Sequence, residues 1–256
     1  MYFCIKTFSC NQREKPCFLL TKKIKRYIIV YMRVEPIAYI RTDFREKFGI
    51  PRQSGRAPSV FATIEFLAPY RAKEFFRGLE GYSHLWLIFD FSLTRGKGFS
   101  ATVRPPRLGG NERVGVFASR SPFRPNHLGL SCVKLEKIVT EADGVSLVVS
   151  GADLLDGTPI IDIKPYLPHA DCIVGAKGGY SEQGVAHRLA VEFPQTLLEQ
   201  ISENKRAGLL ECLADDPRPS YKTDSERVYG MRFAEYNVRF TVEGDTLTVC
   251  GVEKEL

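Results

Sequence analysis

The sequence lacks any apolar run long enough to cross a lipid bilayer. Its longest uninterrupted apolar stretches span residues 27–32 and 85–89, far short of the roughly 20 residues that a transmembrane helix needs. The first 31 residues also lack the continuous apolar segment and the small-residue cleavage site of a secretory signal peptide. These absences exclude a transmembrane protein and argue against secretion.

Paired cysteines with the spacing of a redox motif or a zinc site are missing as well. The seven cysteines are scattered without a CxxC pair, and the four histidines show no metal-ligand spacing. We therefore expect buried or inert thiols in a reducing cytosol, a cytoplasmic protein and no metal site.

Several common catalytic motifs do not occur. There is no GxGxxG turn after a strand, no phosphate-binding P-loop, no HExxH and no GxSxG. The usual sequence signs of a dinucleotide-binding domain, a zinc peptidase or an α/β-hydrolase are therefore missing.

The positive charge of the chain is confined to one end. There are 36 Lys and Arg against 30 Asp and Glu, and residues 1–31 alone hold seven basic residues against one acidic residue. These residues show no helical periodicity, so we expect a disordered or mis-assigned tail with Met32 as the true first residue. A mitochondrial transit peptide is the weaker alternative, because such peptides are usually rich in Arg and Ser.

Within the neutral remainder, basic residues gather between positions 95 and 124, with Glu112 as the one acidic residue among them. A segregated patch of this kind can bind phosphate even on a neutral protein. A solvated loop face is an equally weighted alternative. The patch consists of Arg95, Lys97, Arg104, Arg107, Arg113, Arg120 and Arg124.

Short apolar segments separated by Gly and Pro predict a mainly β fold. In residues 32–193 we expect a closed or nearly closed β-barrel domain and one short amphipathic helix over residues 70–80. The expected strands cover residues 35–41, 60–67, 83–91, 113–118, 130–139, 145–152, 159–163 and 187–193.

A smaller C-terminal α+β domain is expected over residues 194–256. Residues 194–216 have the apolar spacing of a helix, which Gly208 would interrupt. Two further strands, over residues 235–242 and 246–252, are joined by a turn at Gly244 and Asp245.

Residues 114–131 hold the densest set of groups suited to chemistry. Arg120 and Arg124 can hold an anionic group by forked hydrogen bonds, and Asn126 can both donate and accept. Gly129 allows a close approach of the backbone. The alternative is a structural turn in which both arginines pair with carboxylates.

Five motifs of the chain resemble the TrmO (TsaA-like) family of S-adenosylmethionine-dependent tRNA (adenine-N6)-methyltransferases. The resemblance implies a single-sheet β-barrel and methyl transfer to N6 of threonylcarbamoyl-adenosine at tRNA position 37. It also implies the anticodon loop as partner and a homodimer with the methyl donor near its interface. The motifs are PRQSG (51–55), GLEGYSHLWLIF (78–89), TVRPPRLGGNERVGVFASRSPFRPNHLGLS (102–131), DLLDGTPIIDIKPYLP (153–168) and DPRPSY (216–221).

The resemblance also implies the residues that contact the cofactor. Ser92 departs from the pattern, because many family members have His there, and its shorter side chain leaves a contact to water. The plain alternative for Asp156 and Gly157 is a hairpin turn. The implied cofactor residues are Pro51, Arg52, Gln53, Ser92, Leu93, Arg120, Leu130, Leu155, Asp156, Gly157 and Thr158.

The chemistry needs orientation more than activation, because the donor already carries a reactive methyl group. The acceptor nitrogen is a weak nucleophile, and a side chain that takes its proton or hydrogen bond would help. Asn126 and Asp162 are the candidates for this role. Arg104, Arg107 and Arg124 are expected to hold phosphates of the anticodon loop.

Two other classes of function remain open from the sequence. The first is a β-barrel that binds RNA or S-adenosylmethionine without catalysis, which the loss of the usual His at Ser92 mildly favours. The second and weaker reading is a hydrolase that uses Asp153, Asp156 and Asp162.

Overall fold

The computed structural model describes residues 34–105, 108, 112–182, 187–218 and 227–255. The expected tail over residues 1–31 lies outside these ranges, and so does Arg107. Within the described part of the chain, no helix is long and apolar enough to cross a membrane.

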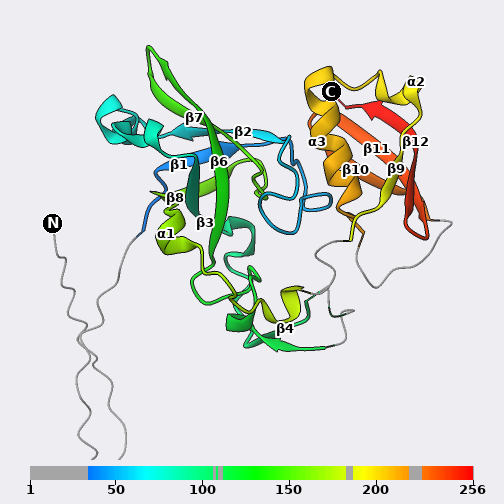
Figure 1. Ribbon diagram of the computed structural model, residues 1–256, viewed down its shortest axis with the longest axis horizontal. Coiled ribbons are helices and arrows are strands. Elements are labelled where there is room, and N and C mark those ends of the chain that lie inside the picture. Colours follow the sequence, from blue (N-terminus) through cyan, green and yellow to red (C-terminus); the bar gives the residue numbers. More distant parts are fainter. Residues whose placement is uncertain (1–33, 106–107, 109–111, 183–186, 219–226, 256) are drawn as a thin grey trace, which may run out of the picture. The chain divides into compact units, whose positions relative to one another are not determined.

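Six strands close into one barrel, which confirms the expected single-sheet architecture (Figure 1). Neighbours follow the order β1-β2-β7-β6-β3-β8, β8 pairs back with β1, and every pair is antiparallel. The strands are β1 (Ala38–Arg41), β2 (Phe61–Phe66), β3 (His84–Asp90), β6 (Leu128–Glu141), β7 (Gly144–Ser150) and β8 (Thr158–Pro165).

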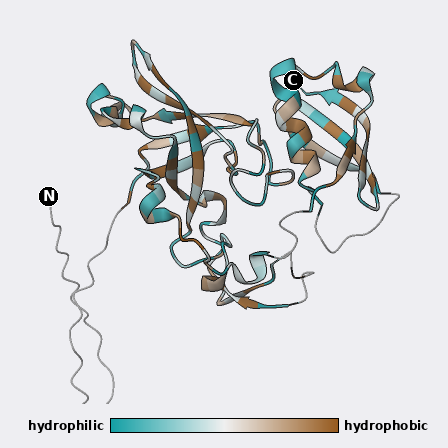
Figure 2. Ribbon diagram, viewed as in Figure 1, coloured by the Kyte–Doolittle hydropathy of each residue, from teal (hydrophilic) through white to brown (hydrophobic). Residues whose placement is uncertain are grey.

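Alternation along the strands builds the barrel core. Leu85 and Leu87 on β3 are fully buried, as are Leu147 and Val149 on β7, while the residues between them are only partly buried. Successive side chains of a strand point to opposite faces of the sheet, so one face of each strand fills the barrel. Hydrophobic residues accordingly recur along the barrel strands (Figure 2).

The prediction of one amphipathic helix over residues 70–80 is wrong. The chain forms three short 3₁₀ turns there: Ala68–Tyr70, Lys73–Phe76 and Leu79–Gly81. Gly78 has a φ of 85°, a left-handed conformation that breaks a regular α-helix. Phe76 is nevertheless buried and packs edge-to-face on Phe66 of the barrel.

The C-terminal α+β region has a four-stranded sheet of order β10-β11-β12-β9. Its strands are β9 (Ala190–Glu192), β10 (Tyr229–Phe233), β11 (Tyr236–Glu243) and β12 (Thr246–Lys254). We expected residues 187–193 to be the last strand of the barrel domain, which is wrong, because β9 runs parallel to β12. Strand β10 was not predicted.

Two helices stand where one interrupted helix was expected. They are α2 (Gln195–Leu198) and α3 (Glu203–Ala214), and the break falls between them rather than at Gly208. Gly208 is buried inside α3 because the helix lies close to another segment there. A Cβ atom at this position would meet Val60 Cγ2 at 2.8 Å and the carbonyl oxygen of Ser59 at 3.1 Å.

The long loops between the barrel strands carry small elements of their own. A two-stranded ribbon pairs β4 (Thr102–Val103) with β5 (Val114–Gly115), and short 3₁₀ turns cover Ser92–Thr94 and Val116–Ala118. The strand expected over residues 113–118 is therefore only partly confirmed. Helix α1 (Pro168–Asp171) and a 3₁₀ turn at Gly179–Glu182 follow β8.

Candidate active site

A cavity of about 640 Å³ opens beside the end of β3 and the start of β6. It is lined by residues 51–53, by residues of the 117–131 segment, by Phe89 and Phe91, and by Asp153. Three aromatic side chains line it: Phe89, Phe91 and Phe117, the last of which is 80% exposed. The cavity therefore combines aromatic surfaces with the charged groups Arg120, Arg124 and Asp153.

A second cavity, of about 250 Å³, lies next to the first. Residues 89–94 and 153–158 form most of its lining. The two cavities share Phe89, Phe91 and Asp153, and the two phenyl rings pack edge-to-face with centroids 5.0 Å apart. The shared residues make the two cavities neighbouring parts of one candidate site.

All of the implied cofactor residues line one cavity or the other. The larger cavity is lined by Pro51, Arg52, Gln53, Arg120 and Leu130. The smaller cavity is lined by Ser92, Leu93, Leu155, Asp156, Gly157 and Thr158. Residues up to about one hundred positions apart in the sequence are thus gathered at one place.

Arg120 reaches across the larger cavity to Gln53. Its Nη1 donates to Gln53 Oε1 at 2.5 Å, and Arg124 Nη1 donates to the carbonyl oxygen of Ser119 at 3.1 Å. Among the described residues, neither arginine forms an ion pair with a carboxylate within 4 Å. The alternative in which both arginines serve as structural ion-pair partners is therefore not what the structure contains.

Arg52 has a contact that the sequence did not suggest. Its Nη2 donates to the carbonyl oxygen of Arg218 at 2.8 Å, and Arg218 in turn is paired with Asp216 at 2.9 Å. The hydrogen bond to Asp216 raises the pKa of Arg218. The PRQ and DPRP motifs are therefore joined directly through Arg52.

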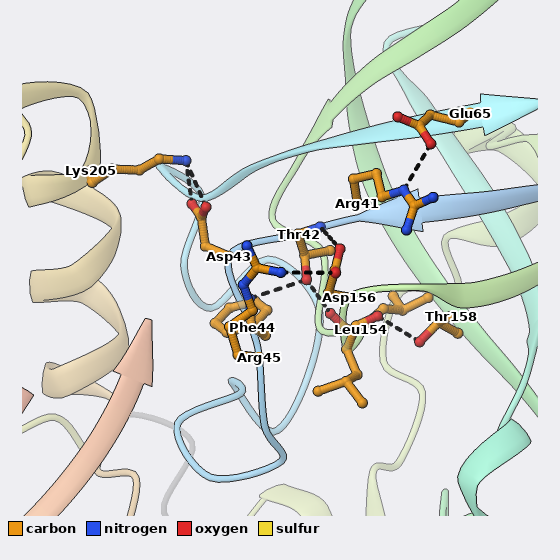
Figure 3. A network of polar contacts seen from close by, with 11 residues as sticks. Arg41, Thr42, Asp43, Phe44, Arg45, Glu65, Leu154, Asp156, Thr158 and Lys205 are labelled. Carbon is orange, nitrogen blue, oxygen red and sulfur yellow. Dashed lines mark hydrogen bonds and ion pairs between the residues drawn. The ribbon is translucent and has the colours of Figure 1, made fainter. Parts of the chain in front are cut away.

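The 155–158 turn is fixed by a network that includes Asp156 (Figure 3). Asp156 Oδ1 accepts from the backbone N–H of Thr42 at 3.0 Å, and Oδ2 lies 3.4 Å from Arg45 Nη1. The backbone N–H groups of Asp156 and Gly157 donate to the carbonyls of Phe44 and Ile40 at 2.9 and 2.8 Å.

Two consequences follow for this turn. The carboxylate of Asp156 holds residues 42–45 in place, a structural role beyond the ligand contact expected of it. Gly157 has a φ of 74°, which favours glycine, as the tight turn requires.

Residues 42–45, which Asp156 holds in place, also join the barrel to the C-terminal sheet. Phe44 forms a β-bridge with Phe233 of β10, and the backbone N–H of Ala234 donates to the carbonyl of Asp43 at 2.7 Å. Lys205 of α3 holds both carboxylate oxygens of Asp43, at 2.7 and 2.6 Å (Figure 3).

The two expected catalytic residues have different positions. Asn126 is exposed and lines the larger cavity. Asp162 lies on β8, outside both cavities, with its side chain 48% exposed and paired to Lys164 at 3.2 Å. The structure therefore places Asn126 in the candidate site and does not bring Asp162 there.

The basic patch is only partly neutralised by its surroundings. Arg95 pairs with Asp90 at 2.7 Å, whereas Arg113 donates to the hydroxyl oxygen of Thr102 at 2.8 Å. Arg104 is exposed and lies outside the two cavities, and Arg107 is outside the described residues.

Two carboxylates in the site, Asp90 and Asp153, were not among the cofactor or base residues expected from the sequence, where Asp153 entered only through the hydrolase alternative. Asp90 lines the smaller cavity with its side chain 4% exposed, and its Oδ1 has no hydrogen-bond partner within the described chain. Asp153 lines both cavities. A signal for Asp90 was present, because it interrupts the otherwise apolar segment 85–91.

Asp153 is held by a residue of the neighbouring strand. Ser131 of β6, 2% exposed, donates its hydroxyl to Asp153 Oδ1 at 2.5 Å. Burial raises the pKa of Asp153 above the ordinary value of 3.8, and the Ser131 hydrogen bond and the charge of Arg120 oppose that rise.

The side chains that line this site suit the binding of S-adenosylmethionine. Phe89 and Phe91 offer apolar faces, Arg120 offers a cation for a carboxylate, and the orphaned Oδ1 of Asp90 offers an acceptor. Glycine at position 129 allows this packing, because a Cβ there would clash with the ring of Phe89. No cluster of three or more metal-binding side chains occurs among the residues that the structure covers.

The fold and the site define a single-sheet β-barrel enzyme with a polar and aromatic ligand cavity, a class distinct from the parallel-sheet nucleotide-binding enzymes. Family models for the tRNA-methyltransferase O N-terminal domain and the TrmO C-terminal domain match residues 39–172 and 186–255. The chain belongs to the TrmO family.

Individual relatives agree with this assignment. The chain is 42% identical to a tRNA (adenine(37)-N6)-methyltransferase of Escherichia coli, over 86% of this chain and 97% of that protein. It is 44% identical to a putative S-adenosylmethionine-dependent methyltransferase of Pseudomonas aeruginosa, over 81% and 91%. A crystal structure of TrmO from P. aeruginosa matches with a TM-score of 0.72 and 37% identity, covering 88% of this chain and 98% of that one.

Proposed function

We propose that this chain methylates N6 of the threonylcarbamoyl-modified adenosine at position 37 of tRNA, with S-adenosylmethionine as methyl donor. Membership of the TrmO family makes the chain an S-adenosylmethionine-dependent tRNA methyltransferase that acts on adenine 37. The threonylcarbamoyl group on the substrate is our own inference from the resemblance of the motifs. The gathering of all the implied cofactor residues around two adjoining cavities supports the proposal most strongly.

The donor would be held by residues of both cavities. Arg120, kept in place by Gln53, would bind the donor's carboxylate, and the 155–158 turn would lie against its nucleoside part. When bound, S-adenosylmethionine supplies an electrophilic methyl group. The protein's contribution is to orient the two reactants and to exclude water from them.

The substrate base would enter the larger cavity from the side of Phe117. Position 37 lies in a single-stranded loop, so the base can turn outward without opening a duplex. Phe117 lines the cavity, is 80% exposed, and offers an aromatic face on which a base can stack. Asn126, exposed in the same cavity, would accept or donate a hydrogen bond at the base edge.

The phosphates of the anticodon loop would lie along the basic patch. Arg124 donates to a neutral carbonyl oxygen and Arg104 is exposed, so both keep positive charge available for phosphate. Arg107 is assigned to the same role from its place in the sequence alone. Since tRNA is the substrate, we place the enzyme in the cytoplasm.

We further propose a homodimer with the donor near its interface. Leu93 and Leu130 support this, because they line the cavities and yet remain 54% and 48% exposed in a single chain. Light scattering on the purified protein would test the proposal, and a strictly monomeric mass at the concentrations used for catalysis would contradict it.

Methyl transfer itself is tested with purified protein, S-adenosylmethionine and tRNA. We expect transfer to tRNA that carries threonylcarbamoyl-adenosine and little or none to the same tRNA lacking the modification. Binding of either ligand without transfer would favour the binding-module alternative. Turnover that needs no methyl donor would favour the hydrolase.

A further inference from the structure

We infer that Asp153 is the catalytic base that takes the proton from N6 of the acceptor adenosine. The inference rests on the proposed function and concerns a residue other than the two candidates taken from the sequence. Transfer of a methyl group to N6 leaves a proton to be removed, because that nitrogen carries one hydrogen before the reaction and none after it. A positioned carboxylate is a suitable acceptor for this proton.

Asp153 lies where the two cavities adjoin. It is the charged residue common to the linings of the two cavities, where it stands with the phenyl rings of Phe89 and Phe91. A donor that spans both cavities and a base that enters the larger one bring the methyl group and N6 together near the residues that the two cavities share. Asp153 is only partly buried there, so a ligand in either cavity can reach it.

The other acidic residues of the region are less suited to the task. Asp162 lies outside both cavities and is paired with Lys164. Asp156 has its two carboxylate oxygens directed to the Thr42 N–H and to Arg45. Asp90 is paired with Arg95 at 2.7 Å, and it lines the smaller cavity but not the larger one.

The surroundings of Asp153 tune it as a base. Its Oδ1 accepts from Ser131 at 2.5 Å, which fixes the orientation of the carboxylate. Burial raises its pKa, while Ser131, the backbone amides of Ser54 and Asp153, and the charge of Arg120 favour its charged form. A carboxylate with a raised pKa binds a proton more tightly than an ordinary one and remains ionised in neutral solution only if the rise is limited.

The proposed step balances without a further reactant. Asp153 takes the N6 proton while the nitrogen's electron pair forms the bond to the donor's methyl carbon. The carbon–sulfur bond breaks, and its electron pair stays on sulfur, which loses its positive charge. Asp153 then releases the proton to solvent through the cavity after the products leave.

Asp153→Asn tests the role of the carboxylate directly. We expect the single-turnover rate of methyl transfer to fall by about 10²–10⁴-fold, the usual contribution of a general base. Donor binding, measured by calorimetry, should stay within about threefold. Asp143→Asn is the matched control, because Asp143 is an exposed carboxylate in the β6–β7 hairpin, outside both cavities. A rate within about threefold of wild type in Asp153→Asn would overturn the inference.

Ser131→Ala tests the same residue while keeping its carboxylate. Loss of the Ser131 hydrogen bond raises the pKa of Asp153 further, so the acid limb of the pH–rate profile should move to higher pH. In the ligand-free protein, the carboxyl ¹³C shift of Asp153 should titrate above 3.8, and higher still in Ser131→Ala. An unmoved limb, together with a pKa at or below 3.8, would show a purely structural carboxylate.

The wild-type protein separates this inference from the proposed function. Absence of transfer by wild type to modified tRNA would contradict the proposed function and this inference with it. Transfer by wild type that persists in Asp153→Asn would contradict the inference alone. A loss caused by unfolding would be seen as a lowered melting temperature, and the Ser131→Ala profile then decides.

Discussion

Arg120 and Gln53 meet across the larger cavity, with 2.5 Å between Nη1 of the arginine and Oε1 of the glutamine. The contact joins the PRQ motif to the loop before β6, and both residues line the cavity. Because Gln53 is neutral, the contact positions the guanidinium without cancelling its charge. This arrangement suits the binding of an anionic group of the ligand.

Arg120→Ala is accordingly expected to affect ligand binding more than folding. Donor binding should weaken by about 1.5–3 kcal/mol, the range of a charge-assisted hydrogen bond. Calorimetric titration with S-adenosylmethionine measures this, with Arg77→Ala, an exposed arginine outside both cavities, as the control. A variant that unfolds while its remaining folded fraction binds normally would assign Arg120 to stability instead.

Phe117→Ala should weaken the binding of tRNA and leave donor binding nearly unchanged. Stacking of a base on an aromatic side chain is worth about 1–3 kcal/mol. Phe75→Ala is the matched control, because Phe75 is 65% exposed and lines neither cavity. Equal tRNA affinities for both variants, measured by fluorescence anisotropy, would remove Phe117 from the substrate site.

Replacing Arg104 and Arg107 with alanine should flatten the salt dependence of tRNA binding. Each single-stranded phosphate that a cation neutralises contributes roughly 0.7 log units of affinity per log unit of salt. We expect a loss of about one to two such contributions, with little change in donor binding. The control replaces Lys73 and Arg77, two exposed cations in the 3₁₀ turns between β2 and β3. A wild-type slope in the Arg104/Arg107 variant would contradict the prediction.

Gly208→Ala should destabilise the protein, although alanine favours helices. The new Cβ would meet Val60 Cγ2 at 2.8 Å and the Ser59 carbonyl oxygen at 3.1 Å, and neither neighbour is the end of a flexible side chain. Overpacking of this kind costs about 1–3 kcal/mol.

The exposed Ala207 of the same helix provides the control for Gly208. Ala207→Gly should cost about 1 kcal/mol through helix propensity alone. If propensity also governed position 208, Gly208→Ala would gain a similar amount in chemical denaturation, and that gain would contradict the packing argument.

The sequence predicted the barrel well because alternation is a local signal. Leu85, Leu87, Leu147 and Val149 occupy every second position of their strands, and burial follows that period. The small β9 was assigned to the wrong sheet, since its pairing with β12 joins residues more than fifty positions apart. No local pattern indicates a partner at that distance.

The sequence motifs predicted most residues of the candidate site, and the tertiary contacts showed which predicted carboxylate lies outside it. The motifs located the implied cofactor residues, and each of them lines a cavity. Asp162 and Asp153 lie in one motif, yet only Asp153 reaches the cavities. The difference depends on where β8 begins and on the partner of each carboxylate, which spacing along the chain does not determine.

Methyl transfer to modified tRNA is tested most directly by mass analysis of nucleosides from tRNA incubated with the purified protein and S-adenosylmethionine. We expect threonylcarbamoyl-adenosine from position 37 to gain one methyl group on N6, only when both the protein and the methyl donor are present. Modified tRNA that remains unmethylated under conditions where the protein is folded and binds the donor would contradict it.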